Sequence, residues 1–321
     1  MNIGIIGAGH IAEKMARTLS GMPQHRSLAV GSRSLEKALS FARDWGFERA
    51  YGSYEELVRD PDVDLVYVAT PNSHHFAHVM LCLQAGKPVL CEKTFMMNAA
   101  QAREVFRVAG EKGLFVTEAI WTRYMPFSAK IRELAYSGII GRPLLIHSSL
   151  SYPVTHKERV MRPELGGGAM LDVGVYVLNF ARMVFADEPV EIRSSAVMGE
   201  TGVDLQNEVS MVWADGRMAN LQTSVLVAND RQGIISGESG YIVVDNVNNP
   251  LEARVFNKAH ELVEVFHAPE QITGFEYQVE ACAEALSHGW LESPFMPHAE
   301  TVRIMEIIDD LLAEWGVPIS F

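Results

Sequence analysis

The sequence predicts an α/β protein with a doubly wound parallel sheet in its N-terminal part and an α+β C-terminal part built on a large, mainly antiparallel open sheet. Short apolar runs alternate with helical stretches up to about residue 120, a glycine-rich turn follows the first run, and longer strands follow Trp121. Because 321 residues exceed what one hydrophobic core usually serves, we expect two domains, residues 1–121 and 122–321. The last helices are candidates for packing back on the first domain.

The expected parallel strands are nearly continuous apolar runs, which indicates that helices bury both of their faces. They lie at residues 2–7, 27–32, 63–70, 87–93 and 114–120. Each stretch between them is read as mainly helical, so successive strands form βαβ units.

The C-terminal part is expected to begin with a helix over Met125–Ser137 and a strand over Leu144–Tyr152, followed by a helix after the glycines at 166–168. Strand-like stretches separated by Asp-Gly and Asn-Asn-Pro turn signals then predict a mainly antiparallel sheet. Two helical patterns, Phe275–Ser287 and His298–Trp315, close the chain. The strand-like stretches are Glu191–Val197, Glu208–Trp213, Arg217–Val227, Gln232–Ser236, Tyr241–Asp245 and Ala253–Phe256.

Charge and composition exclude several classes of partner. A formal net charge of −13, with no basic stripe to offset it, disfavours nucleic acid and anionic membrane surfaces. Cys82, Cys91 and Cys282 show no C-x-x-C spacing, which argues against a disulfide framework and a zinc knuckle. The N-terminus has no signal-peptide pattern and no apolar run is long enough to span a bilayer, so we expect a cytoplasmic protein.

A glycine-rich loop directly follows the first strand and opens a helix. Gly7 permits a tight turn, Gly9 lets a pyrophosphate approach the backbone, and Ala12 keeps the helix close to the sheet. The amides at the helix start, including those of His10 and Ile11, face the phosphates. The alternative is an ordinary glycine turn between a strand and a helix, but the strand–turn–helix context favours dinucleotide binding.

The end of the second strand favours NADP over NAD as the dinucleotide. An acidic residue that binds the ribose 2′-hydroxyl is expected about 20 residues beyond the loop. Ser32 and Arg33 stand there instead, and a hydroxyl with a guanidinium suits a 2′-phosphate. The alternative is that Arg33 is a solvated surface residue.

The third strand in the sequence ends at the ligand edge of the sheet, where side chains can reach the nicotinamide ribose. We expect cofactor contacts from Thr70, Pro71, Asn72 and His75. A metal site formed by His74, His75 and His78 is disfavoured, because no cysteine or carboxylate is placed by the sequence to complete it. We therefore expect no metal.

Glu92 and Lys93 follow the next buried strand, at the same edge as the glycine loop. An ammonium there can hydrogen-bond a reacting oxygen or lower the pKa of a neighbouring acid. The alternative is a solvated lysine at the start of a loop.

Asp172 and Tyr176 lie four residues apart in the expected helix after the glycines, so they project from one face. A tyrosine can exchange the hydroxyl proton as a hydride moves, provided that a cation lowers its pKa from about 10. Without Lys93, a core tyrosine and a helix-start aspartate would be the preferred interpretation.

Five segments together resemble the Gfo/Idh/MocA family of dehydrogenases, within it most closely the branch of dimeric dihydrodiol and NADP-dependent D-xylose dehydrogenases. The segments are GAGHIA, ATPNSHH, CEKT, EAIWTRYMP and GGGAMLDVGVYVLNFA, which are spread over essentially the whole chain. The resemblance implies a Rossmann domain followed by an open sheet that provides the substrate floor and, in a homodimer, the subunit interface.

The resemblance also implies residue roles. Tyr176 is the proton donor or acceptor, Lys93 assists it, and Asp172 completes the motif. Trp121, Arg123 and Arg162 match positions that line the cofactor or substrate site. This chain departs from the family in having Thr94 where the E-K-P motif has proline, so the turn after Lys93 is expected to be less rigid.

The function predicted from these residues is NADP-dependent hydride transfer to or from a carbinol or carbonyl carbon of a sugar, polyol, dihydrodiol or dicarbonyl. Two alternatives remain at this point. One is a glycosidase that recycles a bound NAD-type cofactor, and the other is a dinucleotide-sensing protein without catalysis. The sequence does not identify the physiological substrate, the reacting carbon or the preferred direction.

Overall fold

The computed structural model describes residues 1–317, which form two compact units. The first unit comprises Met1–Tyr124 and Gln271–Glu306, and the second comprises Met125–Glu270 and the described residues from Ile307 to Val317. The predicted fold class is confirmed, because a parallel sheet with helices is followed by a second, largely antiparallel sheet. Among residues 1–317, no helix combines the length and apolar character that crossing a membrane requires.

The first unit contains a six-stranded parallel sheet in the order β3-β2-β1-β4-β5-β6. The order reverses between β1 and β4, where Ile5 pairs with Tyr67, and ligands of such sheets bind beyond the carboxyl ends at that point. The strands are β1 (Asn2–Ile6), β2 (Arg26–Gly31), β3 (Arg49–Tyr51), β4 (Leu65–Val68), β5 (Val89–Glu92) and β6 (Val116–Ala119).

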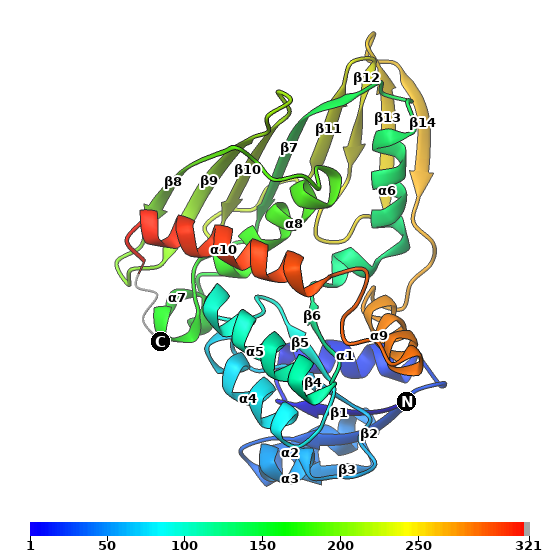
Figure 1. The fold of residues 1–321 in the computed structure, drawn as a ribbon, viewed down its shortest axis with the longest axis vertical. Coiled ribbons are helices and arrows are strands. Elements are labelled where there is room, and N and C mark those ends of the chain that lie inside the picture. Colours follow the sequence, from blue (N-terminus) through cyan, green and yellow to red (C-terminus); the bar gives the residue numbers. More distant parts are fainter. Residues whose placement is uncertain (318–321) are drawn as a thin grey trace. The chain divides into compact units, whose positions relative to one another are not determined.

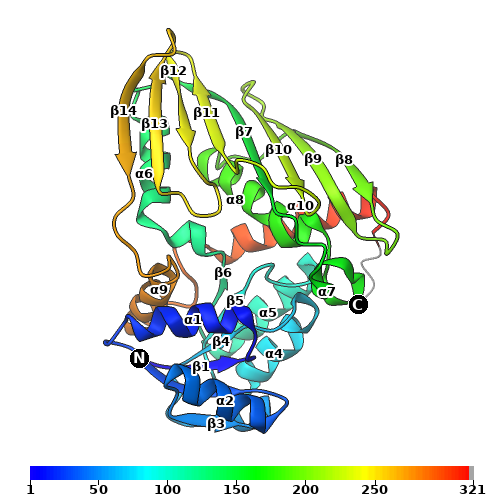
Figure 2. The same ribbon diagram turned by 180° about the vertical axis from the view of Figure 1, so that it is seen from behind.

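Helices cover both faces of this sheet, as the buried strands predict. α4 and α5 lie in front of the sheet in Figure 1, whereas α1 lies in front in the reverse view of Figure 2. Side-chain oxygens of Ser34, Ser53 and Asn98 cap the starts of α2, α3 and α5. The helices are α1 (His10–Ser20), α2 (Leu35–Trp45), α3 (Tyr54–Val58), α4 (Asn72–Gln84), α5 (Ala99–Lys112), the 3₁₀ turn η1 (Trp121–Tyr124) and α9 (Glu276–His288).

The second unit is built on an eight-stranded sheet in the order β14-β13-β12-β11-β7-β10-β9-β8. All neighbouring pairs are antiparallel except β7 and β10, which run parallel. The strands are β7 (Pro143–Ser151), β8 (Glu191–Met198), β9 (Asp204–Val212), β10 (Met218–Ser224), β11 (Gly233–Gly237), β12 (Gly240–Val244), β13 (Glu252–Asn257) and β14 (Leu262–His267).

Residues along β10 alternate between exposed and buried, because only one face of the sheet packs against the core of the unit. The buried face lies against α8, which contacts β7 and β10. The remaining elements are α6 (Pro126–Tyr136), α7 (Glu158–Met161), the 3₁₀ turn η2 (Pro163–Leu165), the π-helical turn η3 (Met170–Gly174) and α8 (Val175–Val184), and α10 (His298–Glu314) runs from the first unit into the second.

Candidate active site

The glycine loop lies at the point where the strand order of the parallel sheet reverses. Gly7 has a φ of +105°, and a Cβ at this residue would lie 2.7 Å from the carbonyl oxygen of Ala69. Only glycine fits this turn. A Cβ on Gly9 would meet no atom within 4 Å, so the space beside it is open.

The first turn of α1 begins directly after that open space. Gly9 is its N-cap and provides no side-chain acceptor for the first amides of the helix. The exposed His10 ring is turned toward Glu13, with 3.6 Å between Nδ1 and Oε2, and Ile11 is half-buried. Open amides at a helix start, next to a glycine without steric hindrance, fit the pyrophosphate of a dinucleotide.

Ser32 and Arg33 follow β2 at the start of α2. Ser32 is buried and its Oγ accepts the backbone N–H of Ser34 at 3.4 Å, whereas Arg33 is exposed. Arg33 therefore directly precedes the N-cap of α2 in the chain. Its positive charge and the N-terminus of the helix both favour a bound anion. This arrangement fits a ribose 2′-phosphate.

The turn after β4 carries Thr70, Pro71 and Asn72 at the start of α4. The hydroxyl of Thr70 lies 2.9 Å from Nδ1 of His78, and burial lowers the pKa of His78 to about 4. His78 is therefore neutral at physiological pH. Within residues 1–317, no group of three or more His, Cys, Asp or Glu side chains is arranged to hold a metal ion.

Glu92 and Lys93 stand at the carboxyl end of β5. Glu92 is buried, and burial raises the pKa of its carboxyl group against the hydrogen bond from Tyr67 and the charge of Lys93. The backbone N–H of Lys93 donates to Glu92 Oε2 at 3.2 Å, and the Lys93 side chain is half-buried. The lysine thus lies beside a carboxyl group that burial makes less acidic.

The structure adds Lys14 to this region, a residue that the sequence analysis missed. Its ammonium lies 4.0 Å from the ring centres of both Trp121 and Phe275. Burial lowers the pKa of Lys14 to about 8, while the nearby carboxyl groups of Glu92 and Glu276 oppose the shift. Trp121 was expected to line the site, and the structure places its ring against the Lys14 ammonium.

We expect Lys14→Met to stabilise the protein at neutral pH. In the folded chain the pKa falls from 10.5 to about 8, so the cost of burying the ammonium is full below pH 8 and disappears as the pH rises toward 10.5. Methionine removes this cost and keeps contact with the aromatic rings. Urea unfolding should show a gain of about 1 to 2 kcal/mol at pH 7 that shrinks by pH 10. An equal loss of stability at both pH values would contradict this expectation.

Arg123 lies in the turn after β6 and is mostly buried. Its Nη2 donates to Glu300 Oε1 at 2.7 Å, so its charge is balanced within the first unit. A neighbouring carboxyl group, that of Glu118, has its pKa raised to about 7 by burial.

In the second unit, Asp172 and Tyr176 occupy the start of one continuous helical segment. The segment differs from the expected regular helix, because Asp172 lies in the π-helical turn η3 and Tyr176 in the first turn of α8. Such wide turns often occur at functional sites. Tyr176 is 7% exposed, and Asp172 Oδ1 accepts a hydrogen bond from Arg159 Nη1 at 2.7 Å. The sequence analysis did not single out Arg159.

Asp204 fixes the start of this helical segment and was also missed. Its Oδ2 accepts the N–H of Met170 at 2.8 Å and the amide of Asn207 at 2.7 Å. Gly168 has a φ of +112°, and a Cβ there would lie 2.3 Å from Asp204 Oδ1. Gly168 is therefore required because the backbone at this position approaches the Asp204 carboxyl group closely. Burial raises the pKa of that carboxyl group.

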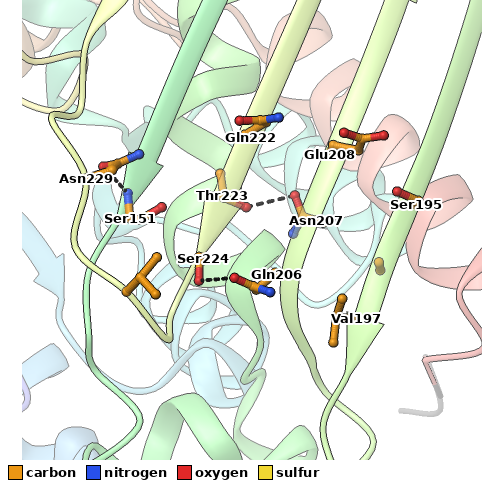
Figure 3. A pocket seen from close by; sticks show the side chains of 12 residues that line it. Ser151, Ser195, Val197, Gln206, Asn207, Glu208, Gln222, Thr223, Ser224 and Asn229 are labelled. Atoms are coloured by element: carbon orange, nitrogen blue, oxygen red, sulfur yellow. Dashed lines mark hydrogen bonds between the residues drawn. The ribbon is translucent and has the colours of Figure 1, made fainter.

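A cavity of about 430 Å³ lies on the sheet of the second unit and is lined by β8, β9, β10 and the end of β7 (Figure 3). Four of its polar side chains form two hydrogen-bonded pairs. Thr223 donates to Asn207 at 2.8 Å, and Ser224 donates to Gln206 at 3.1 Å. Asn207 thereby connects the cavity wall to Asp204 and the helical segment behind it. Arg162, the remaining expected site residue of this unit, is exposed and pairs with Glu158 and Glu164.

The expected residues thus gather in two groups. The loops after β1, β2, β4 and β5 place the glycine loop, Ser32, Thr70 and Lys93 at one edge of the first sheet, and Trp121 follows β6. Asp172 and Tyr176 belong to the second unit. Their joint action with Lys93 stays a prediction.

Known proteins resemble this chain over its full length. Residues 1–120 match the model of an oxidoreductase family with an NAD-binding Rossmann fold, and residues 128–243 match the Gfo/Idh/MocA C-terminal domain. The trans-1,2-dihydrobenzene-1,2-diol dehydrogenase of Xenopus laevis is 35% identical over 98% of both chains. The enzyme of that name from Mus musculus is 33% identical over 98% of this chain and 96% of the relative.

Solved structures agree. A 3-ketoreductase from Actinomadura kijaniata in complex with NADP and TDP-benzene is 25% identical, covers 96% of both chains and superposes with a TM-score of 0.87. An aldose-aldose oxidoreductase from Caulobacter crescentus, 20% identical over 98% of this chain and 97% of that one, shares the fold with a TM-score of 0.87.

Proposed function

Because this chain belongs to the Gfo/Idh/MocA oxidoreductase family, we propose that it is an NADP-dependent dehydrogenase or reductase that acts on a CH–OH group or its carbonyl counterpart in a dihydrodiol, sugar, polyol or dicarbonyl. The observation that carries the proposal is the common edge of the parallel sheet, where the glycine loop, the Ser32–Arg33 pair and Lys93 all lie. The relatives named as dihydrodiol dehydrogenases favour a vicinal diol among these substrates.

The first unit has the groups that an NADP molecule needs. The amides after Gly9 would hold the pyrophosphate and Arg33 would pair with the 2′-phosphate, while the turn at Thr70–Asn72 would contact the nicotinamide ribose. When bound, the nicotinamide accepts or supplies the hydride.

The chain's own residues handle the proton. In the oxidation direction, Tyr176 accepts the proton of the substrate hydroxyl, and the Lys93 ammonium hydrogen-bonds the same oxygen and stabilises its negative charge. A phenol is a base only when a cation lowers its pKa, and Lys93 supplies that charge. Arg159 pairs with Asp172 and keeps its charge balanced four residues before Tyr176.

A titration and a turnover screen test the proposal. Titrations that follow quenching of protein fluorescence should show that NADPH binds more tightly than NADH. Addition of a trans-dihydrodiol, xylose or glucose to the protein with NADP should then lead to reduction of NADP. NADPH oxidation with 2-oxoaldehydes tests the reverse direction. Tight NADPH binding without turnover of any of these substrates would favour the sensing protein. Release of a free sugar from a glycoside without net NADP reduction would favour the glycosidase.

We also propose that the protein is a cytoplasmic homodimer formed through the sheet of the second unit. Leu145 on β7 and Met218 on β10 are paired neighbours, 39% and 38% exposed, and they make the outer face of the sheet partly apolar. The three cysteines are free and buried, as suits a reducing compartment. Sedimentation should give twice the chain mass of 35.6 kDa.

A further inference from the structure

The turn that follows Lys93 is enclosed by the first unit. Thr94 and Phe95 are fully buried, and the Phe95 ring stacks on Phe106 with 4.9 Å between their centres. The peptide groups of this turn lie between β5 and α5, outside any regular element. Side chains of neighbouring elements contact several of these groups.

His75 contacts the turn from one side. This side chain of α4 is completely buried, and its Nδ1 lies 3.0 Å from the carbonyl oxygen of Thr94 and 3.1 Å from that of Phe95. Its Nε2 lies 2.8 Å from the carbonyl oxygen of Thr70. The ring therefore lies between the lysine turn and the turn that borders the proposed nicotinamide site. Because burial lowers its pKa, the neutral imidazole carries a single N–H and donates to carbonyl oxygens of one of these turns.

Glu118 contacts the same turn from β6, the strand that lies next to β5 in the sheet. Its Oε1 accepts the N–H of Phe95 at 3.2 Å, and its Oε2 accepts the hydroxyl of Thr301 at 3.3 Å. The Sγ of Cys91 lies 3.8 Å from the Phe95 carbonyl oxygen. Both polar groups of the Phe95 peptide unit are thus engaged by buried side chains from separate elements.

We propose that His75 and Glu118 are positioning residues that together hold the Thr94–Phe95 turn, and through it fix where Lys93 presents its ammonium. The inference rests on the proposed function, in which Lys93 stabilises the reacting oxygen. It also assigns a role to the residues around Thr94, which stands where a proline would restrict the chain. The restriction comes from two side-chain contacts instead of a ring.

The position of the Lys93 ammonium depends on its backbone because a lysine side chain has four rotatable bonds and is flexible. Its precision is set by its backbone and by the groups around its stem. A displacement of about 1 Å at a reacting group can lower a rate by about 100-fold. Buried hydrogen bonds that keep the turn in one position therefore act on kcat more than on cofactor binding.

Paired variants test the proposal. His75→Asn keeps an amide donor near the position of Nδ1, whereas His75→Leu removes it, and both variants lose the contact with Thr70. Glu118→Gln keeps the acceptor for the Phe95 N–H without the charge, whereas Glu118→Leu removes the acceptor. Each pair therefore compares the presence and absence of one hydrogen bond to the turn.

We expect kcat to fall between about 10- and 100-fold in His75→Leu and Glu118→Leu, and to recover most of this loss in the Asn and Gln variants. The dissociation constant for NADPH should change less than about threefold in the Glu118 variants, because the glycine loop, the Thr70 turn and Arg33 are untouched. His75→Asn and His75→Leu both lose the contact with Thr70, so their dissociation constants should agree within about threefold while their kcat values differ. Equal losses within a pair, or a loss confined to NADPH affinity, would overturn the assignment.

A second measurement does not depend on turnover. Acylation of Lys93 by a water-soluble amine reagent, followed by peptide mass spectrometry in the absence of substrate, should be at least about threefold faster in the two Leu variants, because a looser turn exposes the amine. Lys112, at the exposed end of α5, provides the internal reference. If wild-type protein turns over no substrate, the proposed function fails, yet unchanged labelling of Lys93 in folded Leu variants would still refute the positioning role. Thermal melts establish that those variants are folded.

Discussion

Lys93→Met and Tyr176→Phe are each expected to lower kcat by about 100- to 10,000-fold, the range that proton-transfer groups contribute. Methionine keeps the length of the lysine stem and removes its charge, and phenylalanine removes only a hydroxyl. Both changes spare the glycine loop and Arg33, so the dissociation constant for NADPH should stay within about threefold of wild type. Stopped-flow single-turnover rates and fluorescence titration measure the two quantities separately.

Matched controls make this result specific. Lys112→Met removes an exposed lysine, and Tyr136→Phe removes a phenol that donates to the Val184 carbonyl oxygen at 2.8 Å. Neither should change kcat. The double variant of Lys93 and Tyr176 should be little slower than the slower single variant, because both groups act on one proton transfer. If the losses in kcat of the two single variants multiply in the double variant, or if either single variant keeps full activity, the proposed mechanism is contradicted.

The elements that the sequence predicted correctly are those with large buried faces. β1, β2, β4, β5 and β6 are apolar runs covered by helices, and periodicity reveals such strands. Two strands had no counterpart in the sequence analysis. β3 has three half-buried residues at the edge of its sheet, and β14 is a mostly exposed edge strand. Edge strands bury little, so they leave a weak pattern.

The site shows the same division between local and distant causes. The glycine loop could be predicted because its function depends on consecutive residues. Lys14 could not, since its partners Trp121 and Phe275 are more than 100 residues away in the chain and α1 alone shows an ordinary helical lysine. Asp204 likewise fixes a turn that begins more than 30 residues earlier. Such residues are defined by tertiary contacts, which a single sequence does not reveal.

Replacement of Arg33 by alanine should lower kcat/KM for NADPH by about 10- to 100-fold and leave kcat/KM for NADH unchanged within about twofold. The loss corresponds to one charge-assisted hydrogen-bonding pair, about 1.5 to 3 kcal/mol, which only the 2′-phosphate can form. Steady-state kinetics with both cofactors give the ratio. Arg43→Ala is the matched control, because Arg43 is also exposed on this segment but lies in the last turn of α2, beside Asp44.

Salt dependence then separates this charge pairing from a general change in the loop. Arg33 is exposed, so its attraction to a 2′-phosphate is screened by added salt. The preference of the wild type for NADPH over NADH should shrink between about 0.05 and 0.5 M potassium chloride, whereas the preference of Arg33→Ala should stay nearly constant. If wild type prefers NADH at low salt, Arg33 is a solvated surface residue and the cofactor is NAD. If both proteins lose their preference in parallel, the discrimination comes from the N-terminus of α2 and Ser32, and the guanidinium is not the group that reads the phosphate.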